Sequence, residues 1–477
     1  MVMGSLNQEA EVAVVGAGPG GYVAALRAAD LGKEVVLIDE RKDLGGVCLL
    51  EGCIPSKALI HASELLEASR EATRMGISFG EPTIDIAKLR SWRQSVSKGL
   101  SRGISSLLAA RGVEVLRGRA RFSGRNSLAI DSGDVAGVDF KHCILATGSS
   151  IVEVPFMKGL DLWTSREALE LPSIPESLMV IGGGYIGLEL GFVYAGLGAK
   201  VTVVELLPHL LAGADRDMVK VVQKRCKSRF EKVLLETEVK AIEKRSGKTK
   251  DAGFRVKLES KGEVSEMEVE QVLVAVGRRP NTADIGLDAA GITLNDRGLI
   301  EVDSTCRTEN PSIFAIGDIT PGPMLAHRAS RQANVAAEVI AGEPSAYDNA
   351  ACPAVVFTDP ELAWAGLTEN EAKAEGRKVK VGKFPLSALG RAKTLGTSDG
   401  FAKIISDPDS ERILGVAVAG PHASELIAEG VLALEMGATL EDMKVTIHPH
   451  PTLSELLMEA AEVAAGSAVH VMPPKKK

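Results

Sequence analysis

The sequence predicts an α/β protein that contains two doubly wound parallel sheets followed by a smaller α+β domain. Two glycine triplets with identical spacing, in residues 16–21 and 182–187, each stand between an apolar run and a helical segment. From about Tyr347 the chain changes to mixed short strands and helices. A chain of 477 residues is too long for a single core, so several domains are expected.

The first unit has the order strand, glycine turn, helix and strand, in residues 11–15, 16–21, 19–29 and 35–38. Gly16 makes the turn, Gly18 lets a pyrophosphate approach the backbone, and Gly21 lets the helix pack on the strand. Asp39 directly follows the second strand and is placed to accept a hydrogen bond from a ribose hydroxyl. One such triplet is weak evidence, but the flanking strands and the acid together indicate a dinucleotide site.

Two cysteines, Cys48 and Cys53, lie five positions apart between a Gly-Gly pair and the segment Ile-Pro-Ser-Lys. Pro55 suits a first helical turn, and Ser56 is expected to satisfy a free backbone N–H there. A helix N-terminus beside a cysteine favours the thiolate. Because five residues do not match one helical face, the pair is expected where the backbone is irregular. The segment predicts a redox-active dithiol; the alternative is two buried cysteines that are neighbours by chance.

Residues 57–111 are predicted to form a structural helix pair, since apolar residues recur there at steps of three and four. This series is Leu89, Trp92, Val96, Leu100 and Leu107. Short alternating runs from Val113 to Ile144 then predict strands that end at an Ala-Thr-Gly turn. Prolines at 155, 172 and 175 mark a crossover to the next domain.

The second unit repeats the first: the apolar run 178–181 precedes Gly182, Gly184 and Gly187, and the strand 200–204 precedes Glu205. The interval from Gly182 to Glu205 equals the interval from Gly16 to Asp39, so the chain is expected to carry two dinucleotide sites. A carboxylate at Glu205 would bond a free 2′-hydroxyl and repel a 2′-phosphate, and residues 206–210 contain no Arg or Lys. The second site is therefore predicted to prefer NAD.

The segment 272–281 is predicted to close the second unit, and 313–318 is predicted to be a strand that ends in Gly-Asp. Asp318 is either a helix cap or a carboxylate that meets a polyol. A helix is expected from Met324 to Ile340, and the last domain carries the segment Phe-Thr-Asp-Pro-Glu at 357–361.

His448 and His450 are bracketed by prolines near the C-terminal end, and Glu455 lies five residues after His450. A histidine beside a carboxylate is a base whose tautomer its partner fixes. A metal site is the rival interpretation, but no third ligand is near in sequence, so no metal is predicted.

A net charge of −8 argues against nucleic acid as the main partner, and the chain has no apolar run long enough to span a membrane. The first residues show neither a basic region nor a long apolar run, so we expect no secretory signal and a cytoplasmic protein. Six cysteines in so long a chain do not make a disulfide scaffold. Four of them are expected to be packed thiols: Cys143, Cys226, Cys306 and Cys352.

Together these motifs resemble the pyridine-nucleotide disulfide oxidoreductases, a family of flavoproteins, from about Ala10 to Ala465. The resemblance implies two Rossmann-like dinucleotide-binding domains and an α+β C-terminal dimerisation domain. It implies FAD at the first glycine turn, with Asp39 and Asp318, and NAD at the second, with Glu205. The cofactor-binding positions expected from it are Gly16, Gly18, Gly21, Asp39, Lys57, Thr147, Gly148, Asp318, Ala326, Gly182, Gly184, Gly187, Glu205 and Gly277.

The resemblance also implies the reaction, which is oxidation of protein-bound dihydrolipoamide to lipoamide with reduction of NAD through a Cys48–Cys53 disulfide. Cys53 would be the thiolate next to the flavin, and Cys48 would exchange with the substrate. His450 would be the acid–base residue, oriented by Glu455.

Four further positions receive roles from the resemblance. Lys57 would pair with Glu189 beside the reactive nitrogen of the flavin, and Tyr185 would cover the nicotinamide pocket. His448 is expected to be structural.

The family is dimeric, so the resemblance implies a homodimer with shared active sites. The expected partners are lipoyl-bearing proteins of a 2-oxoacid dehydrogenase or glycine-cleavage complex. The expected domains are an FAD-binding domain, an NAD-binding domain, a central domain that completes the FAD site, an interface domain and a flexible tail, at 1–150, 151–276, 277–346, 347–467 and 468–477.

The sequence departs from the family between the two cysteines, where Leu50-Glu51 replaces the more frequent Asn-Val. An added carboxylate there is predicted to disfavour a thiolate and to shift the dithiol potential.

Five alternatives fit the motifs less well. Glu205 argues against a glutathione-type reductase that uses NADP, and residues 469–477 lack the cysteine pair of mercuric reductase. A transhydrogenase or NADH oxidase would not need Cys48 and His450 together, and a purely structural subunit would not need a complete active site.

Overall fold

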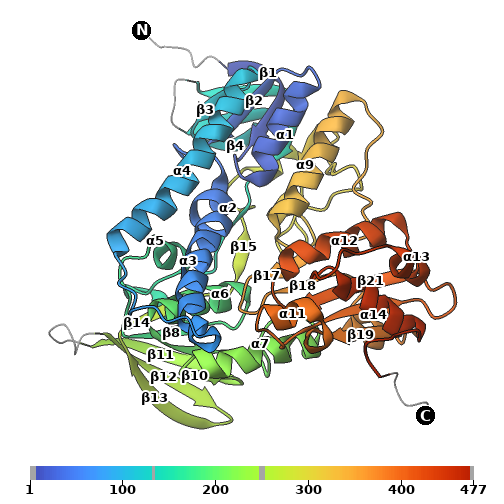
Figure 1. Cartoon of the computed structure of the whole chain (residues 1–477). Helices are drawn as coiled ribbons and strands as arrows, with labels where there is room; N and C mark the ends of the chain where they lie inside the picture. Colours follow the sequence, from blue (N-terminus) through green and yellow to red (C-terminus); the bar gives the residue numbers. More distant parts are fainter. Residues whose placement is uncertain (1–6, 132–134, 246–252, 473–477) are drawn as a thin grey trace.

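The computed structural model describes residues 7–131, 135–245 and 253–472 (Figure 1). Three groups of elements are visible: the first parallel sheet at the top, the second at the lower left, and an antiparallel sheet of late residues at the lower right. The predicted α/β fold, with an α+β domain at the C-terminal end, is confirmed.

The first parallel sheet has seven strands in the order β3-β2-β1-β6-β5-β4, with β16 paired to β6. Its strands are β1 (Asn7–Val15), β2 (Val35–Asp39), β3 (Glu114–Arg117), β4 (Arg119–Gly124), β5 (Ser127–Asp131), β6 (Gly137–Leu145) and β16 (Ile313–Ala315). Strands β1, β2, β3, β6 and β16 are parallel, whereas β4 and β5 pair antiparallel. Late residues therefore complete the sheet that the N-terminal residues begin.

The helices around this sheet include those that carry the cysteine pair. They are α1 (Pro19–Asp30), α2 (Gly46–Glu51), α3 (Cys53–Glu71), the 3₁₀ turn η1 (Ala72–Met75), α4 (Ile86–Ala110) and α9 (Ala326–Ala341). Helices α1 and α9 pack side by side, although the whole second parallel sheet lies between them in the sequence (Figure 1). The predicted helix from Met324 to Ile340 thus begins two residues later than expected.

The second parallel sheet has four strands in the order β10-β9-β8-β14. They are β8 (Ser177–Ile181), β9 (Lys200–Val204), β10 (Lys232–Leu234) and β14 (Gln271–Val274). Its helices are α5 (Ser165–Glu170), α6 (Tyr185–Leu197) and α7 (Arg216–Arg229), with the turn η2 (Pro155–Met157). A three-stranded antiparallel sheet flanks it: β11 (Thr237–Arg245), β12 (Gly253–Ser260) and β13 (Glu263–Val269).

A two-stranded ribbon links the two parallel sheets where the chain crosses between them. Strand β7 (Ser149–Ile151) pairs antiparallel with β15 (Arg278–Pro280). After β15 come α8 (Leu287–Ala290) and the turn η3 (Gly317–Ile319). The segment that leads from the first sheet to the second therefore lies next to the segment that leads back.

The C-terminal sheet is antiparallel, in the order β17-β18-β21-β20-β19. Its strands are β17 (Ala354–Val356), β18 (Leu362–Gly366), β19 (Lys380–Pro385), β20 (Phe401–Ser406) and β21 (Ile413–Ala419). Its helices are α10 (Glu369–Ala374), η4 (Leu386–Ala388), α11 (Gly390–Thr394), α12 (Ala423–Met436), α13 (Leu440–Val445) and α14 (Glu455–Ala465).

Both parallel sheets are buried on both faces, as expected of doubly wound sheets. In the first sheet Val12 and Val14 belong to one apolar cluster, whereas Ala13 and Val15 belong to the cluster on the opposite face. The second sheet divides its strands between two clusters in the same way. Continuous apolar runs such as 178–181 are therefore strands without a solvent face.

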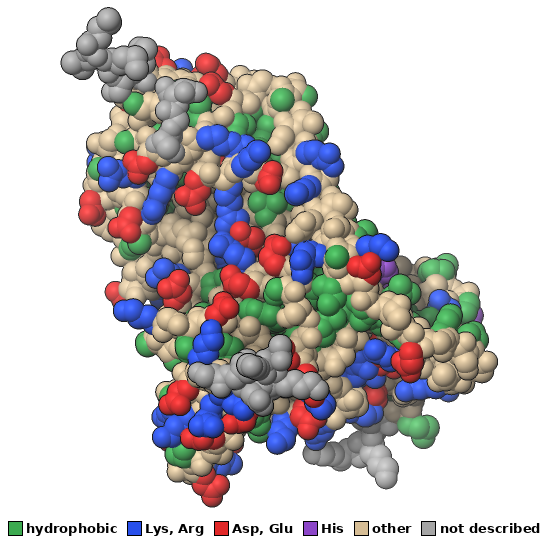
Figure 2. Space-filling model, turned by 90° about the vertical axis from the view of Figure 1, so that its left-hand side faces the viewer, with side chains coloured by type: hydrophobic (Ala, Val, Ile, Leu, Met, Phe, Trp, Pro, Cys, Tyr) green, Lys and Arg blue, Asp and Glu red, His purple; other side chains and the backbone are tan. Residues whose placement is uncertain are grey.

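Helix α4 forms as predicted, but its burial does not follow the apolar series. Trp92, Leu100 and Leu107 are exposed, whereas Arg93 and Ser97 are buried. The small serine allows close approach to the neighbouring helices, and Arg93 pairs with Glu170 at 2.8 Å. On the face seen in Figure 2, acidic and basic side chains are interspersed and hydrophobic ones gather across the middle.

The predicted tail from residue 468 is in contact with the protein over its first residues. His470 Nδ1 lies 2.6 Å from Glu459 Oε1, and Val471 packs against the core of the C-terminal sheet. The lysines at 475–477 lie outside the described residues.

Over the three described ranges, no helix combines the length and apolarity needed to cross a membrane.

Candidate active site

The cysteine pair lies at a break between two helices. Cys48 is in α2, Cys53 is the first residue of α3, and Gly52 between them has φ −145° and ψ −111°. A Cβ on Gly52 would come within 3.0 Å of the Val47 carbonyl oxygen. The irregular backbone expected between the cysteines is therefore present, and it lets their side chains hydrogen-bond to each other.

The two thiols have opposite tendencies to ionise. The hydrogen bond between them, together with burial, raises the pKa of Cys48 far above its ordinary value. The same hydrogen bond lowers the pKa of Cys53 to about 7, and the charge of Lys57 lowers it further against the effect of burial. When the pair is reduced, Cys53 is the thiolate and Cys48 retains its proton.

Ser56 does not cap the helix in the way the sequence predicted. Helix α3 begins at Cys53, two residues before Pro55, so Ser56 already lies inside its first turn. The Ser56 hydroxyl donates to the Cys53 carbonyl oxygen at 2.9 Å, a bond to the residue three positions earlier.

Lys57 and Glu189 form an ion pair next to the dithiol. Lys57 Nζ lies 2.8 Å from Glu189 Oε2, and the carboxylate is almost fully buried. The backbone N–H of Phe357 donates to Glu189 Oε1 at 3.0 Å, and the ammonium lies 4.1 Å from the centre of the Phe357 ring. The ion pair thus joins α3, α6 and the loop after β17.

The first glycine turn has the conformation that its residues predict. Gly16 has φ +98°, and a Cβ on Gly21 would meet the Gly16 carbonyl oxygen at 1.6 Å, so only glycine fits there. Asp39 ends β2 and accepts hydrogen bonds from the backbone N–H of Ala17 at 2.6 Å and of Arg41 at 2.8 Å. The carboxylate is therefore fixed at the N-terminal end of α1.

The second glycine turn repeats this geometry. Gly182 has φ +108°, and a Cβ on Gly187 would meet the Gly182 carbonyl oxygen at 2.1 Å. Glu205 follows β9 and accepts from the backbone N–H of Gly183 at 2.6 Å and of Leu207 at 2.7 Å. The predicted equivalence of the two units therefore extends to the hydrogen bonds of their acids.

The N-terminal ends of α1 and α6 offer free donors. Gly18 and Gly184 are the N-cap residues, and neither helix has a side-chain cap. A Cβ on either glycine would meet nothing within 4 Å. An open helix N-terminus without a cap suits a phosphate group, so both turns fit a dinucleotide.

Tyr185, the first residue of α6, lies close enough to Cys53 and Glu189 for their charges to raise its pKa. Desolvation by the surrounding protein atoms is the largest cause, and the pKa of Tyr185 rises to about 12, although the residue is 42% exposed. The second glycine turn therefore faces the side of the molecule that carries the dithiol.

The remaining predicted cofactor positions are distributed around the ribbon between the sheets. Ser149 donates to Asp318 at 2.5 Å, and Thr147 and Asn281 hydrogen-bond to each other. Gly148 has φ +71° and Gly277 has φ +130°. Ala326 is the first residue of α9.

His450 and Glu455 form the predicted pair, and they lie far from the cysteines of the same chain. His450 Nδ1 lies 2.8 Å from Glu455 Oε1, while the histidine side chain is 77% exposed. Burial opposes ionisation of Glu455, but the hydrogen bonds from His450 and Thr452 outweigh it and lower the pKa of the carboxyl. Helices α13 and α14, which flank His450, lie well apart from α2 at the right-hand edge of the view (Figure 1). His448 is bonded to Glu429 at 2.6 Å and is 4% exposed, as a structural residue would be.

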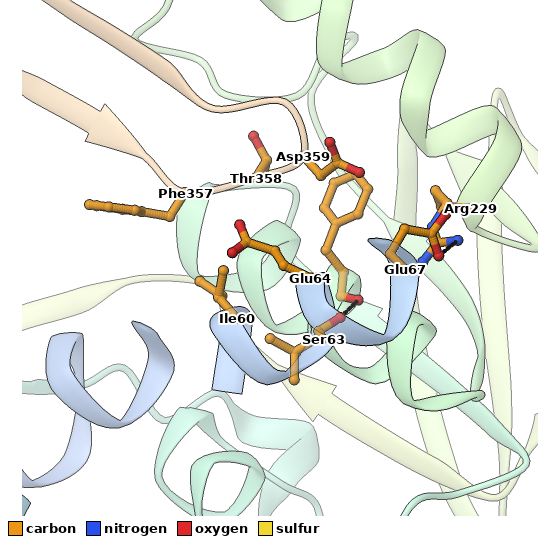
Figure 3. Close-up of a pocket in the computed structure, with 10 residues that line it drawn as sticks. Ile60, Ser63, Glu64, Glu67, Arg229, Phe357, Thr358 and Asp359 are labelled. Carbon is orange, nitrogen blue, oxygen red and sulfur yellow. Dashed lines mark hydrogen bonds and ion pairs between the residues drawn. The ribbon is translucent and has the colours of Figure 1, made fainter. Parts of the chain in front are cut away.

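A pocket beside the redox helix shows how the three parts of the protein meet there (Figure 3). Glu64 and Glu67 enter it from α3, Arg229 from α7 and Asp359 from the loop after β17. Burial, followed by the charges of Glu361 and Asp359, raises the pKa of Glu64. The ion pair of Glu67 with Arg229, at 2.5 Å, ties α3 to the second parallel sheet.

One cluster of carboxylates, Asp215, Asp217 and Glu369, has the spacing of a metal site within the described ranges. Lys403 Nζ lies within 3.0 Å of all three residues, so an ammonium already lies where a metal ion would bind.

Sequence reasoning missed two features of the site. Phe357 was noted only as part of a segment, although its N–H and ring both contact the Lys57–Glu189 pair. The carboxylate of Glu51 was expected to act on the thiols, but it lies 2.8 Å from Arg166 and 3.3 Å from Arg41. Only a survey of related sequences would have signalled these long-range contacts.

Comparison with protein families gives two matches. The family described as pyridine nucleotide-disulphide oxidoreductase matches residues 10–333, and its dimerisation domain matches residues 352–461.

Similar proteins cover the whole chain. The dihydrolipoyl dehydrogenase of Geobacillus stearothermophilus is 48% identical, with 99% of this chain and 100% of the relative covered. That of Bacillus subtilis is 45% identical over the same shares. Among solved structures, LpdA from Mycobacterium tuberculosis has a TM-score of 0.86 at 28% identity and covers 95% of this chain and 99% of its own. The HOCl-induced flavoprotein disulfide reductase RclA from Escherichia coli has a TM-score of 0.82 at 26% identity, with 94% and 98% covered.

Proposed function

The chain belongs to the pyridine nucleotide-disulphide oxidoreductase family, and from this premise we propose that it oxidises protein-bound dihydrolipoamide to lipoamide with reduction of NAD. The dihydrolipoyl dehydrogenases that align over its full length support this substrate. The observation that carries the proposal is the hydrogen-bonded pair Cys48 and Cys53, in which one sulfur is a thiolate near neutral pH and the other retains its proton.

Two dinucleotide cofactors fit the two glycine turns. FAD is assigned to the first and NAD to the second, because Glu205 would repel the extra phosphate of NADP. The residues assigned to FAD are Gly16, Gly18, Gly21, Asp39, Lys57, Thr147, Gly148, Asp318 and Ala326, and those assigned to NAD are Gly182, Gly184, Gly187, Glu205 and Gly277. When bound, the flavin and NAD together supply hydride transfer, which no side chain can provide.

The dithiol exchange follows from the properties of the two sulfurs. His450 of the partner subunit takes the proton of one dihydrolipoyl thiol, and the new thiolate attacks Cys48 Sγ of the disulfide. The Cys48–Cys53 bond breaks and Cys53 leaves as the thiolate, beside the positive charge of Lys57. The second dihydrolipoyl sulfur then attacks the mixed disulfide, its proton passes to Cys48, and the cyclic disulfide product leaves.

A homodimer is inferred from the match of residues 352–461 to the family's dimerisation domain. The C-terminal part also exposes large apolar side chains, among them Leu432, Met436, Val445 and Ile447. Because His450 is exposed and its flanking helices α13 and α14 lie well apart from α2, the proposal is that each active site combines the dithiol of one chain with the His450–Glu455 pair of the other.

The first four domains expected from the sequence are proposed unchanged, whereas the expected flexible tail from residue 468 is held at His470 and Val471. The proposed partners are lipoyl-bearing proteins of a 2-oxoacid dehydrogenase or glycine-cleavage complex. The separate sheets support the divisions near residues 150, 276 and 346. A cytoplasmic location stays a prediction.

An anaerobic titration of the purified protein with dihydrolipoamide tests the function. A long-wavelength charge-transfer band should appear and be discharged when NAD is added, and Cys48→Ser, which cannot form the disulfide, should not respond to dihydrolipoamide. Flavin reduction by NADH without any response to dihydrolipoamide would refute the proposal and favour an oxidase or transhydrogenase.

A further inference from the structure

Glu51 lies at a sensitive place in the redox segment. It is the last residue of α2, three positions after Cys48 and directly before the break at Gly52. Its Oε2 atom accepts hydrogen bonds from Arg166 Nη2 at 2.8 Å and from Arg41 Nη2 at 3.3 Å. One carboxylate oxygen therefore joins the end of α2 to two other segments of the chain.

Helix α2 has little stability of its own. It has six residues, no side-chain cap at Gly45 and no basic residue in its last turn. A carboxylate at a helix C-terminus is also unfavourable, because the peptide dipoles place a partial negative charge there. Contacts with other segments must therefore hold this helix in place.

The start of α2 is fixed by the backbone of the first glycine turn. The Gly45 N–H donates to the Ala17 carbonyl oxygen at 2.9 Å. A Cβ on Gly46 would come within 2.6 Å of Gly18 Cα, so the two segments are in close contact. The other end of α2 has the two arginines of Glu51 as its polar anchors.

The segments that carry the two arginines are themselves held by hydrogen bonds or by packing. Arg41 follows Asp39 by two residues, and its backbone N–H is bonded to the Asp39 carboxylate. Arg166 lies in α5, which begins with a capping box of Thr164 and Glu167 and is anchored in the core of the second sheet. The ion triplet therefore links the redox segment to both parallel sheets.

Two arginines offset the charge of Glu51. Lys57 acts electrostatically on both cysteines and Glu189 on Cys53, whereas the Glu51 carboxylate is neutralised by its two partners. The two ion pairs point instead to a role of Glu51 in the position of the helix end.

We propose that Glu51 is a positioning residue: bonded to Arg41 and Arg166, it fixes the C-terminal end of α2 and so holds Cys48 at bonding distance from Cys53. The inference rests on the proposed dithiol function, and it adds residues that set how readily the disulfide forms. Removing the anchor lets the end of α2 move, which lowers the effective concentration of one sulfur at the other.

The test is the equilibrium of the full-length protein with mixtures of reduced and oxidised dithiothreitol. Reduced dithiothreitol gives up two electrons and two protons and closes to its own disulfide, while the Cys48–Cys53 bond breaks and takes them up. Acid quenching, alkylation and mass measurement then count the free thiols without any assay of activity. Glu51→Gln and Arg166→Met should each shift the midpoint ratio toward reduction by about two- to fivefold, the range of a partly exposed ion pair.

A matched control and a pH measurement separate positioning from other effects. Arg111→Met removes a 2.7 Å ion pair between Asp30, the last residue of α1, and Arg111, which directly follows α4, and should leave the midpoint unchanged. The double variant of Glu51 and Arg166 should shift the midpoint less than the sum of the single shifts, because the two residues share one interaction. The pKa of Cys53 should remain near 7 in Glu51→Gln.

Three outcomes would overturn the inference: midpoints equal to that of wild type, fully additive shifts, or a Cys53 pKa that falls in Glu51→Gln, which would show a direct charge effect. A wild-type protein that forms no disulfide at all would instead refute the proposed function.

Discussion

Replacement of Lys403 by methionine should destabilise the contact between the second parallel sheet and the C-terminal sheet. The Lys403 side chain is fully buried, and its Nζ lies 2.6 Å from Asp215, 2.8 Å from Glu369 and 3.0 Å from Asp217. The variant Lys403→Met keeps most of the volume but leaves three carboxylates without their shared cation.

The size of the destabilisation follows from the hydrogen bonds and ion pairs that the three carboxylates keep in Lys403→Met. Asp215, 4% exposed, still accepts from the backbone N–H groups of Glu369 and Asn370, and Asp217 still pairs with Lys383. Because these bonds compensate only in part, we expect a loss near the usual cost of breaking a buried ion pair, about 3–5 kcal/mol.

The dependence on pH has a definite sign. Hydrogen bonds to Asp215 and Glu369 raise the pKa of Lys403 against the opposing effect of burial, so its contribution is complete below the ordinary value of 10.5 and is lost as pH rises through the raised pKa. Burial opposes ionisation of Asp217, but its lysine partners lower its pKa below the ordinary 3.8. The difference between wild type and variant should therefore shrink as pH falls through the lowered pKa.

Thermal unfolding followed by calorimetry measures this loss of stability. Each kcal/mol lost from the free energy of unfolding lowers the thermal unfolding midpoint by about 2–4 °C for domains of 150 to 250 residues. Lys383→Met is the control: that side chain is 43% exposed, pairs with Asp217 and lies over the ring of Phe401, and its ion pair should be worth less than about 1 kcal/mol. Equal midpoints for the two variants would refute the reasoning that burial makes Lys403 important.

The remaining predictions concern the dithiol, the shared site and the first glycine turn. In the reduced protein, the thiolate absorbance should titrate near pH 7, and this titration should vanish in Cys53→Ser. In Cys48→Ser the titration should move toward pH 9, because the hydrogen bond from Cys48 is the largest cause of the lowered pKa of Cys53. An unchanged titration in Cys48→Ser would contradict this. A hybrid dimer of one Cys48→Ser chain and one His450→Gln chain should keep about half of the wild-type turnover if the active sites are shared, because one of its two sites then has both residues intact. If the sites are not shared, each site lacks one of the two residues. The turnover should then be at most that of a site without its acid–base group, which is reduced roughly 10²–10⁴-fold. Gly21→Ala should abolish flavin absorbance in the purified protein because its Cβ would meet the Gly16 carbonyl oxygen, whereas Gly99→Ala, with nothing within 4 Å, should leave the flavin bound and stabilise α4 by up to about 1 kcal/mol.

Local patterns predicted the framework of this protein well. The strand expected at Lys200–Val204 is β9 itself, and the acids Asp39 and Glu205 stand where the two glycine turns require them. Such predictions succeed because turn glycines and apolar runs restrict the backbone dihedral angles of the residues that carry them.

Helix α4 shows where local patterns fail. Its apolar series predicted the helix correctly, yet Arg93 and Ser97 face the interior while Trp92 is exposed. Periodicity shows that a helix has two faces, but which face is buried depends on the elements that pack against it.

The sequence by itself therefore determined the two glycine-turn units, the dithiol segment and the His450–Glu455 pair, because each depends on residues that are close together in the chain. The tertiary structure decided which arginines neutralise Glu51, which groups surround the Lys57–Glu189 pair and which carboxylates surround Lys403. Those partners lie far away in the chain and meet only when separate elements pack, and the free energy of a charge depends on the burial and neighbours that packing creates.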